Sequence, residues 1–172
     1  MHYCVLVFLE DGKLAKDCVK EMVDAAMEPY GNGIEWDWFQ IGGRWTGYFD
    51  GYDPEKDPKN KRKCTYCNGT GKRKDIKVEN GCNACGGTGK ETLWPSDWKF
   101  RKEDVIPVKK LTQKHLDGAY AVRCDGWGWY GGEEYTPWKD PKSRFKPRGR
   151  PPLSWLKKEY SKGVVVVVDC HN

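Results

Sequence analysis

Apolar residues in this chain of 172 residues are grouped in short segments with different spacings. Two continuous runs, Tyr3 to Leu9 and Val164 to Val168, predict strands that are covered on both faces. From residue 13 to residue 27 apolar side chains recur every four positions, which predicts an amphipathic helix. A second, shorter helix is predicted from 154 to 161. The remaining apolar residues are mainly aromatic and lie in segments rich in tryptophan and glycine.

This order of elements predicts an α+β fold with a mostly antiparallel sheet and two helices, and the specific expectation is a ferredoxin-like topology. We expect the first and last strands to pair antiparallel. That pairing would bring His2 and Cys4 near Cys170 and His171. A second metal site there is an open alternative, although Cys170 and His171 point to opposite faces of an extended strand.

Four cysteines carry the clearest chemistry in the sequence. Cys64 and Cys67 form one Cys-x-x-Cys pair, Cys82 and Cys85 form another, and each pair is followed by x-Gly-Thr-Gly. Two such loops can complete a tetrahedron of thiolates around one structural Zn²⁺ ion, whereas a redox dithiol or disulfides are the alternatives. We therefore predict an inserted zinc-binding lobe at 51–92 and a core domain formed by 1–50 and 93–172.

The two repeats resemble the cysteine-rich region of the DnaJ chaperone family, whose repeat is C-x-x-C-x-G-x-G. The resemblance covers Cys64 to Lys90. The family region carries four repeats and two zinc ions, while this chain has two repeats, enough for one site with four cysteine ligands. The sequence contains no His-Pro-Asp tripeptide of a J-domain. The resemblance therefore implies a zinc knuckle and does not imply co-chaperone activity.

Composition narrows the setting of the protein. No apolar run approaches the roughly 18 residues that a membrane span needs, so no membrane association is expected. The segment His2 to Leu9 lacks a basic leader and is expected to be a strand and not a signal peptide. Eight cysteines, four of them in a metal pattern, fit a reducing compartment, and we predict a cytoplasmic protein.

Basic residues gather in two places, and the net charge is +5. Those near the cysteines are candidates for contacting nucleic acid, or they are a solvated surface that offsets the thiolate charge. The second group includes Lys-Pro-Arg-Gly-Arg-Pro, which resembles the AT-hook, a motif that lies in the minor groove of A·T tracts. A structural proline-rich loop is the alternative. The candidates are Lys61, Arg62, Lys63, Lys72, Arg73, Arg144, Lys146, Arg148 and Arg150.

The tryptophan- and glycine-rich segments allow either a packed core or an aromatic ligand cleft with polar anchors. The cleft candidates are Trp36, Asp37, Trp38, Arg44, Trp45, Trp127 and Trp129. The run Trp-Asp-Trp-Phe-Gln-Ile-Gly-Gly-Arg-Trp, together with the final Val-Val-Asp-Cys-His, resembles small bacteriophage and bacterial proteins. That resemblance implies a phage or prokaryotic setting and brings no established activity.

Three functions follow from these features. The first is a non-enzymatic, zinc-stabilised module that contacts nucleic acid or a host protein. The second is a binder of a small, nucleotide-like ligand in the aromatic cleft, with an anti-defence role in which it sequesters a host signal. The third is a hydrolase-type enzyme that uses Asp169, His171 or the pair Glu133 and Glu134. No nucleophile motif or phosphate loop supports the third. Oligomeric state is not indicated.

Overall fold

A computed structural model describes five stretches of the chain: residues 1–10, 16–31, 36–73, 81–131 and 151–172. Their contacts divide the chain into two compact units. The main unit combines Met1–Tyr52 with Phe100–Asn172, and the second unit is Asp53–Lys99. Each unit has its own sheet, and each is described by itself.

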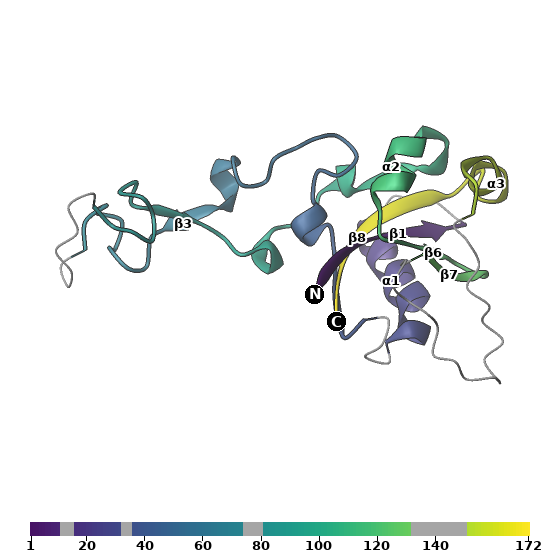
Figure 1. Cartoon of the computed structure of the whole chain (residues 1–172), viewed down its shortest axis with the longest axis horizontal. Coiled ribbons are helices and arrows are strands. Elements are labelled where there is room, and N and C mark those ends of the chain that lie inside the picture. The colour runs from purple at the N-terminus through teal and green to yellow at the C-terminus, as the bar shows by residue number, and fades with distance from the viewer. Residues whose placement is uncertain (11–15, 32–35, 74–80, 132–150) are drawn as a thin grey trace. The chain divides into compact units, whose positions relative to one another are not determined.

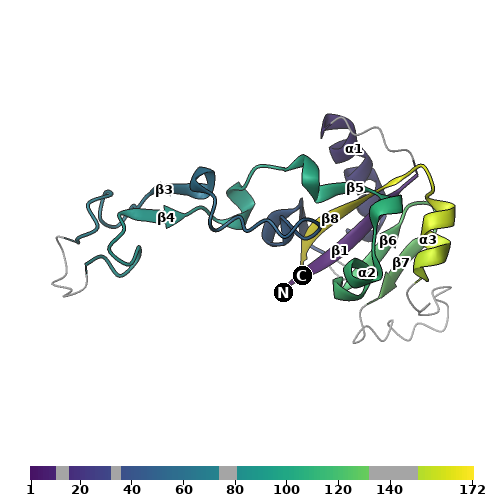
Figure 2. The ribbon, with the colours of Figure 1, turned by 90° about the horizontal axis from the view of Figure 1, so that it is seen from above.

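The main unit is built on a sheet of six strands (Figure 2). The strand order is β2-β8-β1-β6-β7, and β5 also pairs with β8. The strands are β1 (His2–Leu9), β2 (Trp38–Ile41), β5 (Val105–Pro107), β6 (Ala121–Cys124), β7 (Gly128–Gly131) and β8 (Val164–His171). The described residues also contain three α-helices, α1 (Lys16–Met27), α2 (Gln113–Gly118) and α3 (Leu153–Glu159).

Single-turn 3₁₀ helices occur in the connections of both units. They lie at Glu28–Tyr30, Gly43–Trp45, Pro58–Asn60, Pro95–Asp97, Lys102–Asp104 and Val108–Lys110.

The predicted α+β class with a mostly antiparallel sheet is confirmed. So is the antiparallel pairing of the first and last strands, in which His2 lies opposite His171. The strand order, however, is not ferredoxin-like. In that topology an antiparallel strand separates the two parallel strands of a βαβ unit. Here β1 and β6 pair directly and in parallel. Strand pairing of this kind depends on contacts distant in sequence, which local patterns do not encode.

The sheet is covered on both faces, as its two apolar strands require (Figure 1). Alternate residues of β1, such as Val5 and Val7, pack with α1 on one face. The intervening residues, such as Leu6 and Phe8, pack with side chains of α2 and α3 on the other. All five valines of β8 are buried and alternate between the two cores. Burial on both faces explains why these strands are continuously apolar.

The second unit contains little regular structure apart from a two-stranded hairpin, β3 (Lys61–Lys63) with β4 (Lys90–Thr92). This hairpin forms the base from which the chain enters and leaves the cysteine repeats. The structure describes no residues from 74 to 80, between the two repeats.

Candidate metal centre

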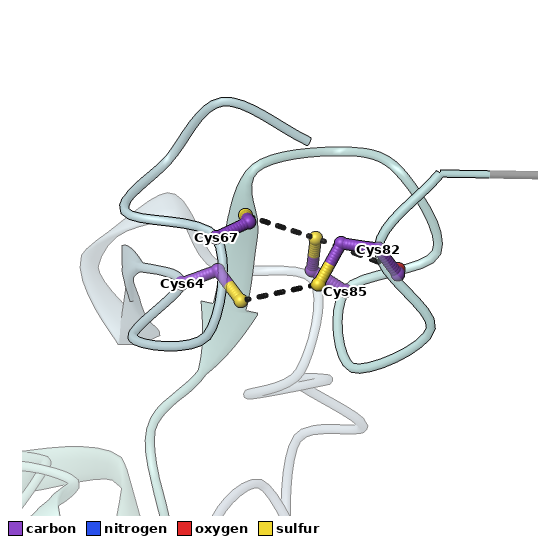
Figure 3. Close-up of side chains that lie close together, drawn as sticks. All are labelled: Cys64, Cys67, Cys82 and Cys85. Carbon is purple, nitrogen blue, oxygen red and sulfur yellow. Dashed lines mark hydrogen bonds between the residues drawn. The ribbon is translucent and has the colours of Figure 1, made fainter. Parts of the chain in front are cut away.

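The four cysteines of the two repeats converge in the second unit (Figure 3). Their sulfur atoms all lie within 4.8 Å of one another. The Sγ atoms of Cys64 and Cys82 are 3.9 Å apart, and those of Cys67 and Cys85 are 3.8 Å apart. Four sulfurs bound about 2.3 Å from one tetrahedral ion would be about 3.8 Å from one another. These separations are far longer than a disulfide bond. The cluster therefore has the donor type and the spacing of a tetrahedral metal site.

Each repeat folds into the same knuckle, which orients its second cysteine. In the first, the Gly71 N–H donates to the Sγ of Cys67 at 3.3 Å, and in the second the Gly89 N–H donates to the Sγ of Cys85 at 3.3 Å. Hydrogen bonds from backbone N–H groups stabilise thiolate charge and fix the ligand's direction. The repeated sequence thus supplies both the ligands and the donors that hold them.

The threonine of each x-Gly-Thr-Gly segment closes its knuckle. The Thr70 hydroxyl donates to the Cys67 carbonyl at 2.7 Å, and the Thr88 hydroxyl donates to the Cys85 carbonyl at 2.6 Å. The same hydroxyls also accept the N–H of the second residue onward, Lys72 or Lys90. No role was predicted for these threonines, although their repetition at the same position of each repeat was the available signal.

The final glycine of each repeat allows the two knuckles to approach each other closely. Gly71 has a φ of +74° and Gly89 has a φ of +73°. A Cβ on Gly71 would lie 2.3 Å from the Gly87 carbonyl oxygen, and one on Gly89 would lie 2.3 Å from the Gly69 carbonyl oxygen. Both positions therefore exclude a side chain for two reasons, backbone conformation and close approach.

The electrostatic environment separates the thiols of the first pair. Burial raises the pKa of the Cys64 thiol to about 11. Burial also opposes ionisation of Cys67, but hydrogen bonds led by that of the Gly71 N–H outweigh it and lower its pKa to about 7. Ion binding must displace the remaining protons, so affinity at this site is coupled to pH.

Several of the predicted basic contact residues are engaged within the second unit. The Nε of Arg62 donates to Glu91 at 2.7 Å, an interaction that lowers the pKa of that carboxyl. The Nζ of Lys61 donates to the Thr92 hydroxyl at 2.6 Å. Lys63 and Lys72 are exposed. The AT-hook-like candidates, Arg144, Lys146, Arg148 and Arg150, lie outside the described residues, as do Glu133 and Glu134.

The structure does not gather the seven cleft candidates at one place. Trp36 packs on the core beside α1, and its Nε1 donates to the Met27 carbonyl at 3.2 Å. Trp129 also packs on that face, whereas Trp45 packs on the opposite core. Trp127 is half exposed and meets the ring of Trp155 edge-on. Most of these rings therefore serve as core, which was the alternative interpretation.

The remaining three candidates lie together near the end of β8. Asp37 contacts His171 at 2.9 Å, Trp38 lies edge-on to His2, and the Arg44 N–H donates to Asp169. His2 was expected near His171 but was not assigned to this group. The antiparallel register of β1 and β8 was the signal that could have placed it there.

The fold and the cysteine site together define an α+β protein with a second unit that carries a cluster of four cysteines at metal-binding distance. Among the described residues no helix is long and apolar enough to cross a membrane. Comparisons of the chain with protein-family models, curated proteins and solved structures found no match.

Proposed function

We propose that the second unit is a zinc-stabilised module that binds single-stranded nucleic acid and has no enzymatic role. One observation carries this proposal. Tyr66, which stands between the two cysteines of the first knuckle, is 62% exposed. The guanidinium of Arg73 lies over its ring, 5.5 Å from the centroid. An exposed aromatic ring beside cations is the arrangement on which unpaired bases stack.

The metal site gives this surface its rigidity. Tyr66 is fixed on both sides by metal ligands, Cys64 and Cys67, so its ring is presented at a defined place without help from a hydrophobic core. The exposed Lys63 and Lys72 add positive charge that can meet phosphates. Part of that charge offsets the net −2 of four thiolates around a divalent ion.

In this proposal the ion is zinc, because four sulfur donors at tetrahedral spacing suit Zn²⁺. The DnaJ-like repeat supplies a knuckle only. The basic segment from 144 to 150 is a second contact with nucleic acid. A phage or prokaryotic cytoplasm is the proposed setting, and a host protein is the alternative partner.

The test is fluorescence anisotropy of the zinc-loaded full chain with a labelled single-stranded oligonucleotide at low salt. Stacking of one base contributes about 1–3 kcal/mol, so Tyr66→Ala is expected to weaken binding about 5- to 150-fold. Tyr66→Phe, which keeps the ring, should retain affinity. Lys72→Ala should make the slope of log affinity against log salt less steep by about 0.7.

Tyr120→Ala is the matched control, because Tyr120 is also an exposed tyrosine, 41% accessible, but belongs to the main unit. It should leave the anisotropy curve unchanged. Equal loss in both alanine variants, or no binding even at low salt, would overturn the proposal. In the second case a protein partner would become the candidate to pursue.

A further inference from the structure

A polar cluster lies at one end of the main sheet, on the face that also carries the core beside α2 and α3. Three strands contribute to it in register. His2 of β1 lies opposite His171 of β8, and His171 lies opposite Trp38 of β2. Asp169 is two residues before His171 and therefore faces the same side. The cluster thus joins the two ends of the sequence to the tryptophan- and glycine-rich motif.

Each histidine of this cluster is paired with a carboxylate through the same ring nitrogen. The Nδ1 of His2 lies 2.9 Å from Asp169 Oδ1, and the Nδ1 of His171 lies 2.9 Å from Asp37 Oδ1. A carboxylate accepts, so each imidazole donates its Nδ1–H and, when neutral, keeps a lone pair on Nε2. The side chains of His2 and His171 are 31% and 40% exposed, so neither imidazole is sealed inside the core.

The carboxylate behind His2 is built into the fold. Asp169 is fully buried, and its Oδ2 accepts a hydrogen bond from the backbone N–H of Arg44 at 3.0 Å. The preceding Gly43 leaves room for it, since a Cβ there would lie 2.6 Å from the Cβ of Asp169. A buried charge is retained only with compensating partners. The Gly-Gly-Arg of the motif therefore serves to hold this carboxylate in place against His2.

An imidazole that donates one nitrogen to a carboxylate and offers the other is the arrangement found for metal-binding histidines. The spacing of the two rings agrees with a shared ion. A ring bound at about 2.1 Å has its centre about 3.2 Å from the ion, so two rings at about 90–110° have centres about 4.5–5.3 Å apart. The centroids of His2 and His171 are 4.9 Å apart.

We propose that His2 and His171 are the protein ligands of a second, open site for a divalent transition-metal ion, with Asp169 and Asp37 as positioning residues. Imidazole donors suit Zn²⁺, Ni²⁺, Co²⁺ and Cu²⁺. Two protein ligands leave coordination positions for water or for a donor atom of a bound molecule. Trp38, which is 39% exposed, lies edge-on to the His2 ring with the ring centroids 6.0 Å apart.

The ligand set differs from the one suggested by the sequence, because neither nearby cysteine belongs to it. Cys170 packs in the core on the opposite face of the sheet. Cys4 lies on the same face but is 1% exposed and packs in the core there. This inference concerns the main unit and does not depend on the function proposed for the second.

The test is a calorimetric titration of the full chain with Co²⁺ after the cysteine site has been filled with one equivalent of Zn²⁺. We expect one further equivalent of Co²⁺ to bind. The absorption spectrum of the same sample should lack the thiolate-to-cobalt charge-transfer band that exchange at the cysteines would give. His171→Ala should abolish this equivalent. Asp37→Asn should weaken it about 10- to 100-fold, because carboxylates behind metal-binding histidines contribute by that factor.

His115→Ala is the matched control, since His115 is the third histidine and caps α2, away from the cluster. It should bind Co²⁺ as the wild type does. His2→Ala removes the partner of a buried carboxylate and tests the fold as well, so His171→Ala and Asp37→Asn decide the question. The proposal is overturned if no second equivalent binds to the wild-type chain, or if the equivalent survives in His171→Ala.

Discussion

The two units of this protein are stabilised internally by different interactions. In the main unit, a sheet with apolar cores on both faces buries long runs of side chains, including all of Val5 to Leu9. In the described part of the second unit, the buried apolar residues are Pro54, Trp98 and three of the clustered cysteines. The first unit is stabilised mainly by removing apolar surface from water. In the second unit, the buried cluster consists of the cysteines and not of a hydrophobic core.

The two units therefore differ in the source of their stability. A unit of this size with so few buried apolar groups does not offset the entropy of ordering its backbone. A metal ion bound by the four cysteines would supply the difference, because a site that exists only in the folded state converts binding free energy into folding free energy. We therefore expect that each unit can be unfolded or destabilised while the other stays folded.

The largest effect expected is that of removing the metal. Chelation, or Cys82→Ser, should unfold the second unit, because structural zinc contributes about 10–16 kcal/mol of apparent binding free energy in small zinc modules. Amide resonances from Asp53 to Lys99 should collapse to unfolded positions in NMR spectra, while those of the main unit stay dispersed. Cys18→Ser, a substitution of a cysteine outside the cluster, is the control and should keep both units folded. Loss of both units on chelation would contradict the comparison.

A substitution in the main core should give the opposite result. Leu6 is fully buried in the sheet, so Leu6→Ala should destabilise the main unit by about 2–5 kcal/mol through lost burial and an unfilled cavity. Denaturant unfolding monitored by the main-unit resonances measures this change. Metal content, measured by mass spectrometry, should remain at the wild-type value. A fall in metal content would show that the units are coupled.

Two glycines of the knuckles allow a finer comparison within the second unit. Gly71→Ala and Gly86→Ala both place a side chain at positive φ, which costs about 1–2 kcal/mol. Only Gly71 also lies against a backbone oxygen, whereas a Cβ on Gly86 would meet nothing within 4 Å. Zinc affinity, measured by competition with a chelator, should fall more for Gly71→Ala. Equal losses would mean that the close approach of the knuckles contributes nothing.

The smallest effect expected concerns an ion pair of the main unit. The hydrogen bond from Arg101 lowers the pKa of Asp50 below its usual range. A carboxyl with a lowered pKa stabilises the fold above the pKa of the unfolded chain, and this contribution is lost as pH falls through the folded value. Asp50→Asn should cost about 0.2–1 kcal/mol at pH 7, since the pair is partly exposed. In thermal melts the difference from wild type should shrink as the pH is lowered below about 4, the usual range of an aspartate pKa, and a difference that stays constant in acid would refute this assignment.

Local patterns predicted much of the fold because they reflect burial and ligand chemistry directly. The continuous apolar run from Tyr3 to Leu9 required cover on both faces, and the structure provides it. The two Cys-x-x-Cys pairs with their glycines indicated a site whose atoms the structure brings within metal-binding distance. In both cases the residues that interact are set by spacing along a short segment.

Which distant segments contact one another could be seen only in the tertiary structure. The parallel pairing of β1 with β6, the distribution of the tryptophans over two cores, and the joining of His2 and His171 to Asp169 and Asp37 all depend on strand order. The two apolar strands and the cysteine cluster could be predicted from the sequence, because period and spacing are local properties. Strand order is set by the free energy of packing the whole chain, and no single segment contains enough information to predict it.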